Sequence, residues 1–483
     1  MTTLLRLCGT HAVRVLLAST LLCGLSGPDA RGQAETRGVA LLGTAGGGPA
    51  FVRGNDAILF NPANLVLSDR GARAVLTLGN TFAYSGGSLL QFNYYNDYLA
   101  AGRHLGEAEI TRMLDGWFGA AEANELRRAG LYADVVPLAV TVRGGAWAFG
   151  LAVRARSHNS FGVNRGWLDL LLRGTGENRD LPLDATFHTL ATTEVSLAFS
   201  RRFDRLLVGV APKLVLGTSY VDGTYTATVS ITDEALIQTF DYTIRAAGSF
   251  SRDFLDAVDL FKASPFEEAS FSGPFGPVAG KGLGLDLGLT YVAAPGVLVA
   301  ASVTDLGSVA WDGDAQTLSP VNHTFRFEGL ELNQSRINDE FDGSLGRYAR
   351  SVLDSLARDA YDEVHRVHGG FSTALPTAFH FGSAWYKGRT ILNMGLSMAL
   401  NDAPGNPTRK PSFHAGIEHR LGPVPLRTGV RYGGDGALTI GAGLGLRTRA
   451  YEFGLSVAAT PKTDMMGHGG RYTLALSLVN IHI

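Results

Sequence analysis

Alternation between large apolar and small residues runs through most of this chain, and it limits the fold more than any other feature. Residues 438–447 alternate Leu, Ile, Ala, Leu and Leu with Thr, Gly, Gly, Gly and Arg. Successive side chains of a β-strand point to opposite faces, so such a segment has one bulky face and one small face. The same pattern recurs in residues 147–154, 282–291, 392–401, 426–432, 451–458 and 472–478. The chain is therefore predicted to be all-β.

The small face separates a membrane barrel from a soluble sheet. A soluble β-sandwich also alternates, but its water-facing side carries many Lys, Glu and Gln side chains. Here that side is mostly Gly, Ala, Ser and Thr, and glycine supplies 61 of 483 residues. Strands of about ten residues fit a tilted crossing of a bilayer. Residues 71–483 are predicted to form a closed antiparallel transmembrane β-barrel of about fourteen strands, within a range of twelve to sixteen.

A few charged residues interrupt the small faces of these strands. They are Asp286, Arg427, Arg431, Arg447 and Glu452. An arginine facing lipid at the bilayer midplane costs about 2–4 kcal/mol, so the lumen is the expected environment for these side chains.

The N-terminus has the pattern of an export signal. Arg6 and Arg14 form a basic region at the start of the chain, and residues 15–25 after it are apolar. Residues 32–34, Gly-Gln-Ala, form a cleavage site, with Ala30 as the alternative. Residues 1–34 are therefore expected to be a signal peptide, and the location is expected to be the bacterial outer membrane.

Both cysteines, Cys8 and Cys23, lie in this segment. The exported chain would then have no disulfide, no cysteine-bound metal and no cysteine nucleophile.

Other chemistry is not indicated. A balance of 42 basic and 44 acidic residues leaves no positive surplus for nucleic acid. The histidine pairs 365/368 and 414/419 lack companion carboxylates, so no metal site is predicted. Residues 158–160 read His-Asn-Ser, but neighbours on a strand point to opposite faces and cannot act together. The sequence thus predicts no enzyme, no metal and no cofactor.

Three stretches have helical rather than strand periodicity: residues 107–128, 252–262 and 342–367. Helices are expected there as insertions in the long loops. Their apolar stripes either pack on the rim of the barrel or form a groove for a hydrophobic ligand.

Residues 35–70 do not alternate. This segment begins Gly-rich and then reads Asn-Asp-Ala-Ile-Leu-Phe-Asn-Pro-Ala-Asn-Leu over residues 55–65. It resembles the hatch of the FadL family of outer-membrane transporters and of the related PorV-like barrels of protein secretion. The segments 282–291 and 301–307 resemble an uncharacterised branch of the same superfamily. The resemblance implies that residues 35–70 are an N-terminal plug, with Asn61, Pro62 and Ala63 as its motif. An ordinary Asn-Pro turn is the alternative. The chain departs from many such barrels by ending in Ile483 instead of an aromatic residue.

Three functions compete. The first is FadL-like passage of hydrophobic small molecules, such as long-chain apolar compounds, through a plugged barrel. The second is a PorV-like barrel that does not transport and instead serves secretion-system proteins as a partner. The third and weakest is a membrane-embedded hydrolase. Outer-membrane lipid is the expected surrounding in each case.

Overall fold

The computed structural model describes most of the chain from residue 38 onwards. The described ranges are residues 38–67, 71–89, 97–98, 105–119, 125–174, 179–232, 234–251, 276–328, 332–348, 351–352, 355, 364–406, 409–434, 438–461 and 470–483. The expected signal peptide, residues 1–34, and the expected helix over residues 252–262 lie outside these ranges.

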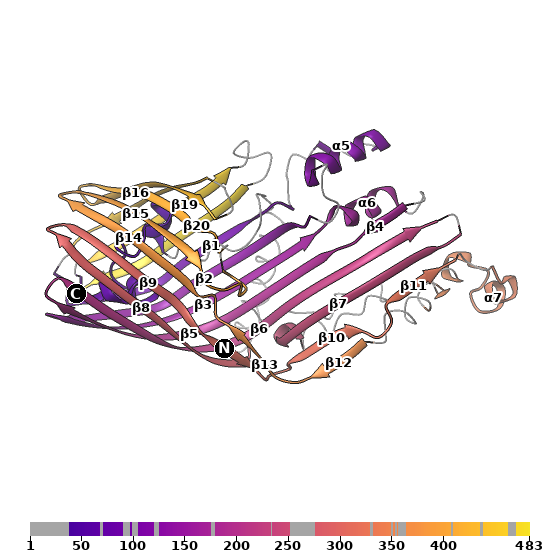
Figure 1. Cartoon of the computed structure of the whole chain (residues 1–483), viewed down its shortest axis with the longest axis horizontal. Helices are drawn as coiled ribbons and strands as arrows, with labels where there is room; N and C mark the ends of the chain where they lie inside the picture. The colour runs from indigo at the N-terminus through magenta and orange to yellow at the C-terminus, as the bar shows by residue number, and fades with distance from the viewer. Residues whose placement is uncertain are drawn as a thin grey trace.

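Fourteen strands form a closed wall in which each strand is antiparallel to both neighbours (Figure 1). Around the barrel they are β1 (Ala74–Gly87), β2 (Arg127–Gly144), β3 (Trp147–Val163), β5 (Ala185–Phe203), β6 (Leu206–Ile231), β8 (Gly280–Ala294), β9 (Val297–Trp311), β14 (Ala378–Lys387), β15 (Thr390–Ala399), β16 (Ser412–Leu421), β17 (Val424–Gly433), β18 (Thr439–Arg447), β19 (Tyr451–Pro461) and β20 (Gly470–His482). The last strand pairs with the first, with Leu78 opposite Val479, and closes the ring. The predicted closed antiparallel barrel is confirmed, and so is its strand number.

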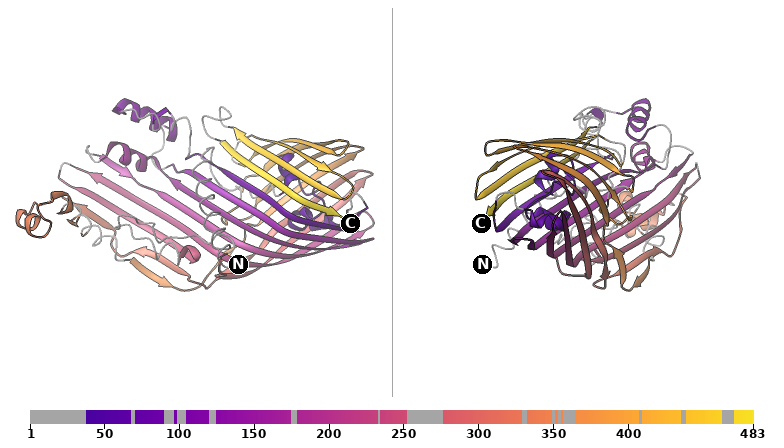
Figure 2. Two further views of the ribbon diagram at one scale, coloured as in Figure 1. Left: turned by 180° about the vertical axis from the view of Figure 1, so that it is seen from behind. Right: turned by 60° about the vertical axis from the view of Figure 1, so that its left-hand side comes forward.

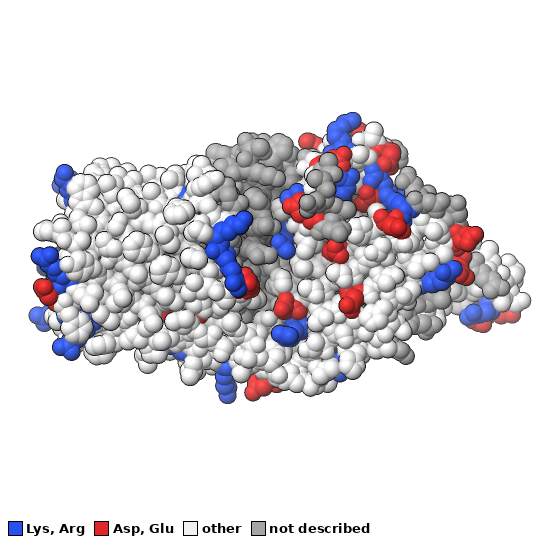
Figure 3. Space-filling model, viewed as in Figure 1, with Lys and Arg blue, Asp and Glu red and all other residues white. Residues whose placement is uncertain are grey.

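The alternation in the sequence decides which side chains face outwards. On β18, Ile440 and Leu444 are exposed, whereas Thr439 and Gly441 between or beside them are buried. The neighbouring β17 exposes Leu426 and Val430 in the same way. On the face that Figure 3 shows, a largely uncharged belt covers the barrel strands, between charges at the turn end and charges over the opposite end. Such a belt suits contact with lipid.

The two ends of the barrel differ. At one end short turns join the strands, and Gly145 and Gly388 provide the left-handed backbone that two of these turns need. At the other end the wall rises on one side into a sheet that continues beyond the belt (Figures 1 and 2). This extension contains β4 (Arg179–Pro182), β7 (Leu236–Gly248), β10 (Gln316–Pro320), β11 (Thr324–Phe327), β12 (Val364–His368) and β13 (Phe371–Ala374).

The extension exists because long strands change partners along their length. Strand β6 pairs with β8 over residues 206–217 and with β7 over residues 219–231. Strand β9 changes from β14 to β13 after a bulge at Asp305, whose φ of 59° lies in the left-handed region. Thr377 Oγ1 donates to the carbonyl oxygen of Asp305 at 2.9 Å and holds the returning chain at this bulge.

The helices outside the wall are short. They are α5 (Glu107–Phe118), α6 (Arg165–Arg173) and α7 (Gln334–Asp339). The expected helix over residues 107–128 was too long: α5 ends where Gly119 takes a φ of 83°, and β2 has begun by Arg127. In the expected helix over residues 342–367, Val364 already begins strand β12, which pairs with β10. No helix in the described ranges is long and apolar enough to cross a membrane.

Candidate functional site

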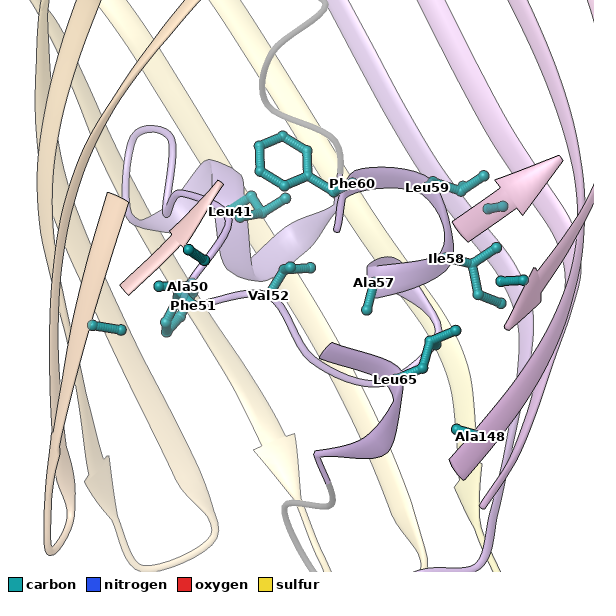
Figure 4. Close-up of a cluster of buried hydrophobic side chains, with 14 of the residues drawn as sticks. Leu41, Ala50, Phe51, Val52, Ala57, Ile58, Leu59, Phe60, Leu65 and Ala148 are labelled. Carbon is teal, nitrogen blue, oxygen red and sulfur yellow. The ribbon is translucent and has the colours of Figure 1, made fainter. Parts of the chain in front are cut away.

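Residues 38–67, here called the luminal segment, lie inside the ring of strands (Figure 2, right). The segment folds as α2 (Val39–Gly43), α3 (Asp56–Phe60) and the 3-10 helix η1 (Pro62–Val66). Its apolar side chains form one buried cluster with the wall, in which Leu41, Ile58 and Leu65 are fully buried (Figure 4). The segment therefore fills the lumen at this level and is packed against the wall.

The turn before η1 is fixed by two asparagines. Asn61 donates from Nδ2 to the carbonyl oxygen of Pro49 at 2.9 Å and to Thr290 Oγ1 of β8 at 3.0 Å. Its Oδ1 accepts the amide N–H of Ala63 at 3.2 Å and caps the helix that begins at Pro62. Asn64 donates to the same Pro49 oxygen at 2.7 Å and accepts from Thr290 Oγ1 at 2.6 Å. The structure thus places Asn61, Pro62 and Ala63 against the wall in one hydrogen-bonded turn.

Two wall glycines make room for this turn. Gly209 of β6 and Gly288 of β8 lie opposite each other in the sheet. A Cβ at position 209 would lie 2.1 Å from the backbone nitrogen of Ala63, and a Cβ at position 288 would lie 2.0 Å from Asn61 Oδ1. Any side chain at either position would displace the turn.

A second row of glycines receives the end of α2. Gly416, Gly429 and Gly441 are neighbours across β16, β17 and β18. A Cβ at position 429 would lie 2.3 Å from the carbonyl oxygen of Thr44, and one at position 441 would lie 2.5 Å from that of Leu42. The glycines on the small face of β18 are thus contact positions for the luminal segment.

Further hydrogen bonds tie the segment to the strands around it. Asn55 Nδ2 donates to the carbonyl oxygens of Val75 at 3.1 Å and Ala139 at 3.0 Å. Ser200 Oγ donates to the carbonyl oxygen of Ala63 at 2.8 Å. On the far side of the lumen, Ser456 Oγ donates to the carbonyl oxygen of Val39 at 2.7 Å. The segment is therefore held by strands on both sides of the barrel.

Charged side chains lie below the luminal segment, near the short turns. Arg427 Nε donates to Glu418 Oε2 at 2.8 Å, and these two residues face each other across β16 and β17. Arg447 donates to Glu452 Oε2 at 3.0 Å across β18 and β19. Arg427 Nη2 approaches Glu452 Oε1 at 3.7 Å and connects the two pairs. All four side chains are mostly buried.

These pairs line an opening between the luminal segment and the short-turn end. Its free volume for water-sized molecules is about 90 Å³. Arg53, Asp56 and Tyr386 contribute to its walls, which are therefore mixed in charge. An opening of this size holds a few water molecules and no long-chain solute.

A second network of charges lies in the wall on the side of β3, β6 and β8. Lys213 Nζ lies 2.8 Å from Asp286 Oδ1 and also binds Asp305. Asp286 Oδ1 accepts the amide N–H of Asp305 at 2.6 Å, which fixes the β9 bulge. Arg156 reaches Asp305 at 3.0 Å and pairs with Glu194. Burying charges is tolerated because each is paired in this way.

Sequence reasoning singled out one member of this second network, Asp286. It missed Arg154, Arg156, Glu194, Lys213 and Asp305, which are all buried. A signal was present, because Arg154 and Lys213 sit on the small face of their strands, as Asp286 does. Arg431, the remaining predicted luminal residue, is also buried and lies opposite His414.

The structure places the candidate chemical residues apart. His365 and His368 lie on strand β12 and not at the end of a helix, so a spacing of three sends them to opposite faces. His158, Asn159 and Ser160 are consecutive on β3, and Asn159 hydrogen-bonds Ser157 and Thr189. Among the described residues, no group of three or more His, Asp or Glu side chains could hold a metal ion.

Comparison with known proteins gives a family and a set of similar barrels. The model of a family of unknown function, DUF5723, matches residues 92–459. No curated protein matches the chain. The toluene transporter TodX of Pseudomonas putida is 11% identical with a TM-score of 0.47, covering 95% of this chain and 99% of that one. The monoaromatic hydrocarbon channel CymD is 13% identical with a TM-score of 0.43, covering 93% of this chain and 98% of that one. The expectation of an uncharacterised branch agrees with the match to a family of unknown function.

Proposed function

The chain belongs to DUF5723, a family of unknown function. From the residues that line and fill the lumen, we propose that the protein is a gated outer-membrane channel for small apolar molecules. In this proposal the barrel spans the outer membrane after removal of a signal peptide. The luminal segment is the plug, and it closes the channel in the state described here. The observation that carries the proposal is the chemistry of the wall where the plug sits.

That part of the wall is lined by alanine and glycine. Seven alanines pack in the cluster around the luminal segment: Ala139, Ala148, Ala152, Ala198, Ala211, Ala300 and Ala384. Gly150, Gly209 and Gly288 contact the segment from β3, β6 and β8. If the segment moved, it would leave a passage lined mainly by these small apolar residues, with Arg143, which donates to the carbonyl oxygen of Leu65 at 2.6 Å, at its edge. Such a surface offers little to ions or sugars, and it suits apolar solutes.

The charged networks would not have to break when the luminal segment moves. They lie in the wall and near the turns, and each charge is paired with another wall residue. The wall can therefore keep its ion pairs while the luminal segment changes position. A ligand opens such a gate when it binds the shifted state more tightly than the closed one.

Tethering the segment tests the proposal. Without its expected signal peptide the chain contains no cysteine, so Asn64→Cys and Thr290→Cys introduce a unique pair at side chains that meet at 2.6 Å. Cells with the oxidised double variant should lose uptake of a small aromatic hydrocarbon, and reduction should restore it. Each single-cysteine variant is the matched control. Uptake that is unchanged by an oxidised tether would contradict gating by this segment.

A secretion or assembly partner is the second candidate. Two observations favour it: the luminal segment is bonded to several strands, and a sheet extension projects beyond the belt (Figure 1). A static plug and a large outer surface suit binding of proteins better than passage of solutes. In that case the tether would leave function intact, and removal of the extension strands β10 to β12 would abolish it.

A further inference from the structure

Four aromatic side chains form a continuous surface on the outside of the barrel, at the short-turn end of β3 and β5. Trp147, Phe149, Phe199 and Phe203 are exposed by 42%, 52%, 37% and 52%. The ring centroids of Trp147 and Phe149 are 5.2 Å apart, and those of Phe149 and Phe199 are 5.0 Å apart. The outward face of two strands thus carries a patch of aromatic rings, of which Trp147, Phe149 and Phe199 are in tilted contact.

One cation lies within this patch. Arg201 is directly opposite Trp147 in the sheet, and its guanidinium carbon lies 5.0 Å from the centroid of Phe203. Alternation on β5 turns Phe199, Arg201 and Phe203 to the same outer face. Arg201 is exposed, and no carboxylate of the described residues pairs with it. A guanidinium held over an aromatic ring keeps its donors available for an anion.

The same arrangement recurs elsewhere on this end of the barrel. On β14 the ammonium of Lys387 lies 5.2 Å from the ring centroid of Trp385, which is also exposed. Three turns at this end of the barrel expose Arg205, Arg389 and Arg449, and Asp204 is an acidic neighbour of the first. Aromatic side chains and basic side chains at one level are typical of the layer where acyl chains meet phosphates.

We infer that Trp147, Phe149, Phe199, Arg201 and Phe203 form a binding site for one anionic glycerophospholipid. The phosphate is bound by the guanidinium of Arg201, and the upper part of an acyl chain lies on the rings. A water-soluble acidic partner fits this site less well, because the exposed rings lie on the outer face of the barrel wall, which is the face that meets lipid. The inference needs the barrel to span a bilayer, and it does not depend on which solute crosses it.

Lipid retention in detergent tests the site. The purified barrel is titrated with phosphatidylglycerol, and bound lipid is counted by native mass spectrometry. Arg201→Gln should weaken binding of the first lipid about five-fold, the weight of one basic side chain near an anionic surface. Phe203→Ala should weaken it as well, and Arg201→Lys should restore part of it. Arg205→Gln, in the turn that follows β5 and without an aromatic ring beneath it among the described residues, is the matched control. A difference in gel migration between heated and unheated samples verifies that each variant is folded.

Three outcomes would overturn the site. The first is equal loss in Arg205→Gln and Arg201→Gln, which would mean that the whole rim attracts lipid without a site. The second is displacement of the bound lipid by inorganic phosphate at equal concentration, which would mean a plain anion site. The third is retention of lipid by both Arg201→Gln and Phe203→Ala at the level of the unsubstituted chain.

Discussion

Gly209 and Gly288 face each other across β6 and β8, and the luminal segment occupies the space that side chains would need at both positions. The closest distances, 2.1 Å and 2.0 Å, are to a backbone nitrogen and to a hydrogen-bonded amide oxygen. Neither atom can turn away as the end of a flexible side chain could. The wall and the luminal segment are therefore fitted to each other at this point.

Replacing Gly209 by valine should unseat the luminal segment. Overpacking of a tight contact costs about 1–3 kcal/mol, and here the obstacle is backbone. We expect a lower midpoint of thermal unfolding and a larger ion conductance in planar bilayers. Gly369→Val is the control, because no heavy atom of the described residues lies within 4 Å of a Cβ at that position. A Gly209→Val barrel that conducts and melts like the unsubstituted protein would show that the turn is not held where the structure places it.

Asn61 should tolerate alanine better than aspartate. Alanine removes the donors to Pro49 and Thr290, but Asn64 still bonds both groups, so a loss of about 1–3 kcal/mol is expected. Aspartate keeps the shape and points a carboxylate at the Pro49 carbonyl oxygen, which adds repulsion. Urea unfolding followed by tryptophan fluorescence measures both losses. Asn333→Asp should be neutral, because Asn333 caps α7 through its Oδ1 and an aspartate does the same.

The wall of the barrel could be predicted from the sequence because strand parity is a local property. In β18, the position of Ile440 outside and Gly441 inside follows from alternation alone. The extension could not be predicted in this way. The burial alternation of β6 is interrupted at residues 217–221, where the strand changes its partner, but the sequence does not say which strand pairs with it beyond that point.

The site was less accessible to sequence reasoning, because its contacts join distant residues. Asn61 and Thr290 are separated by 229 positions, and nothing near Thr290 marks it as a partner. The role of Gly416, Gly429 and Gly441 depends on their alignment across three strands, which the sequence does not state. The sequence predicts a small inward-facing residue at each position, but it does not predict which segment fills the space beside it.

The pair Arg427–Glu418 should behave as a buried interaction. Arg427→Glu would face Glu418 and Glu452 with a third carboxylate, and breaking a buried pair costs about 3–5 kcal/mol. The exchanged double variant, Glu418→Arg with Arg427→Glu, should recover part of that loss. Chemical unfolding measures the free energies. Arg336→Glu is the control, since Arg336 and Glu340 form an exposed pair that is worth about 1 kcal/mol or less. Equal losses at both sites would contradict the burial of Arg427.

The contact between α5 and α6 should weaken in acid. Arg173 of α6 donates to Glu107 of α5, and this hydrogen bond lowers the pKa of Glu107 below its ordinary 4.5. A carboxylate with a lowered pKa stabilises the folded state above its unfolded pKa, and it loses that effect as pH falls through the folded value. Hydrogen exchange in α5, corrected for the intrinsic rate, should therefore rise below pH 4.5. Glu107→Gln should show the faster exchange already at pH 7, and Glu328→Gln in a distant loop should not.

Removal of the luminal segment should open the barrel. The closed wall does not include residues 38–67, because β20 pairs with β1 over most of their length and completes the ring without them. A chain with these residues replaced by a Gly-Ser linker of equal length should therefore still fold and insert. Its ion conductance in planar bilayers should rise well above that of the unsubstituted barrel, since alanines and glycines are left lining the level that the segment filled. The same variant should lose selective uptake of apolar compounds, because an open pore does not discriminate. Unchanged conductance would mean that the charged networks close the lumen by themselves, and the segment could then not be the gate.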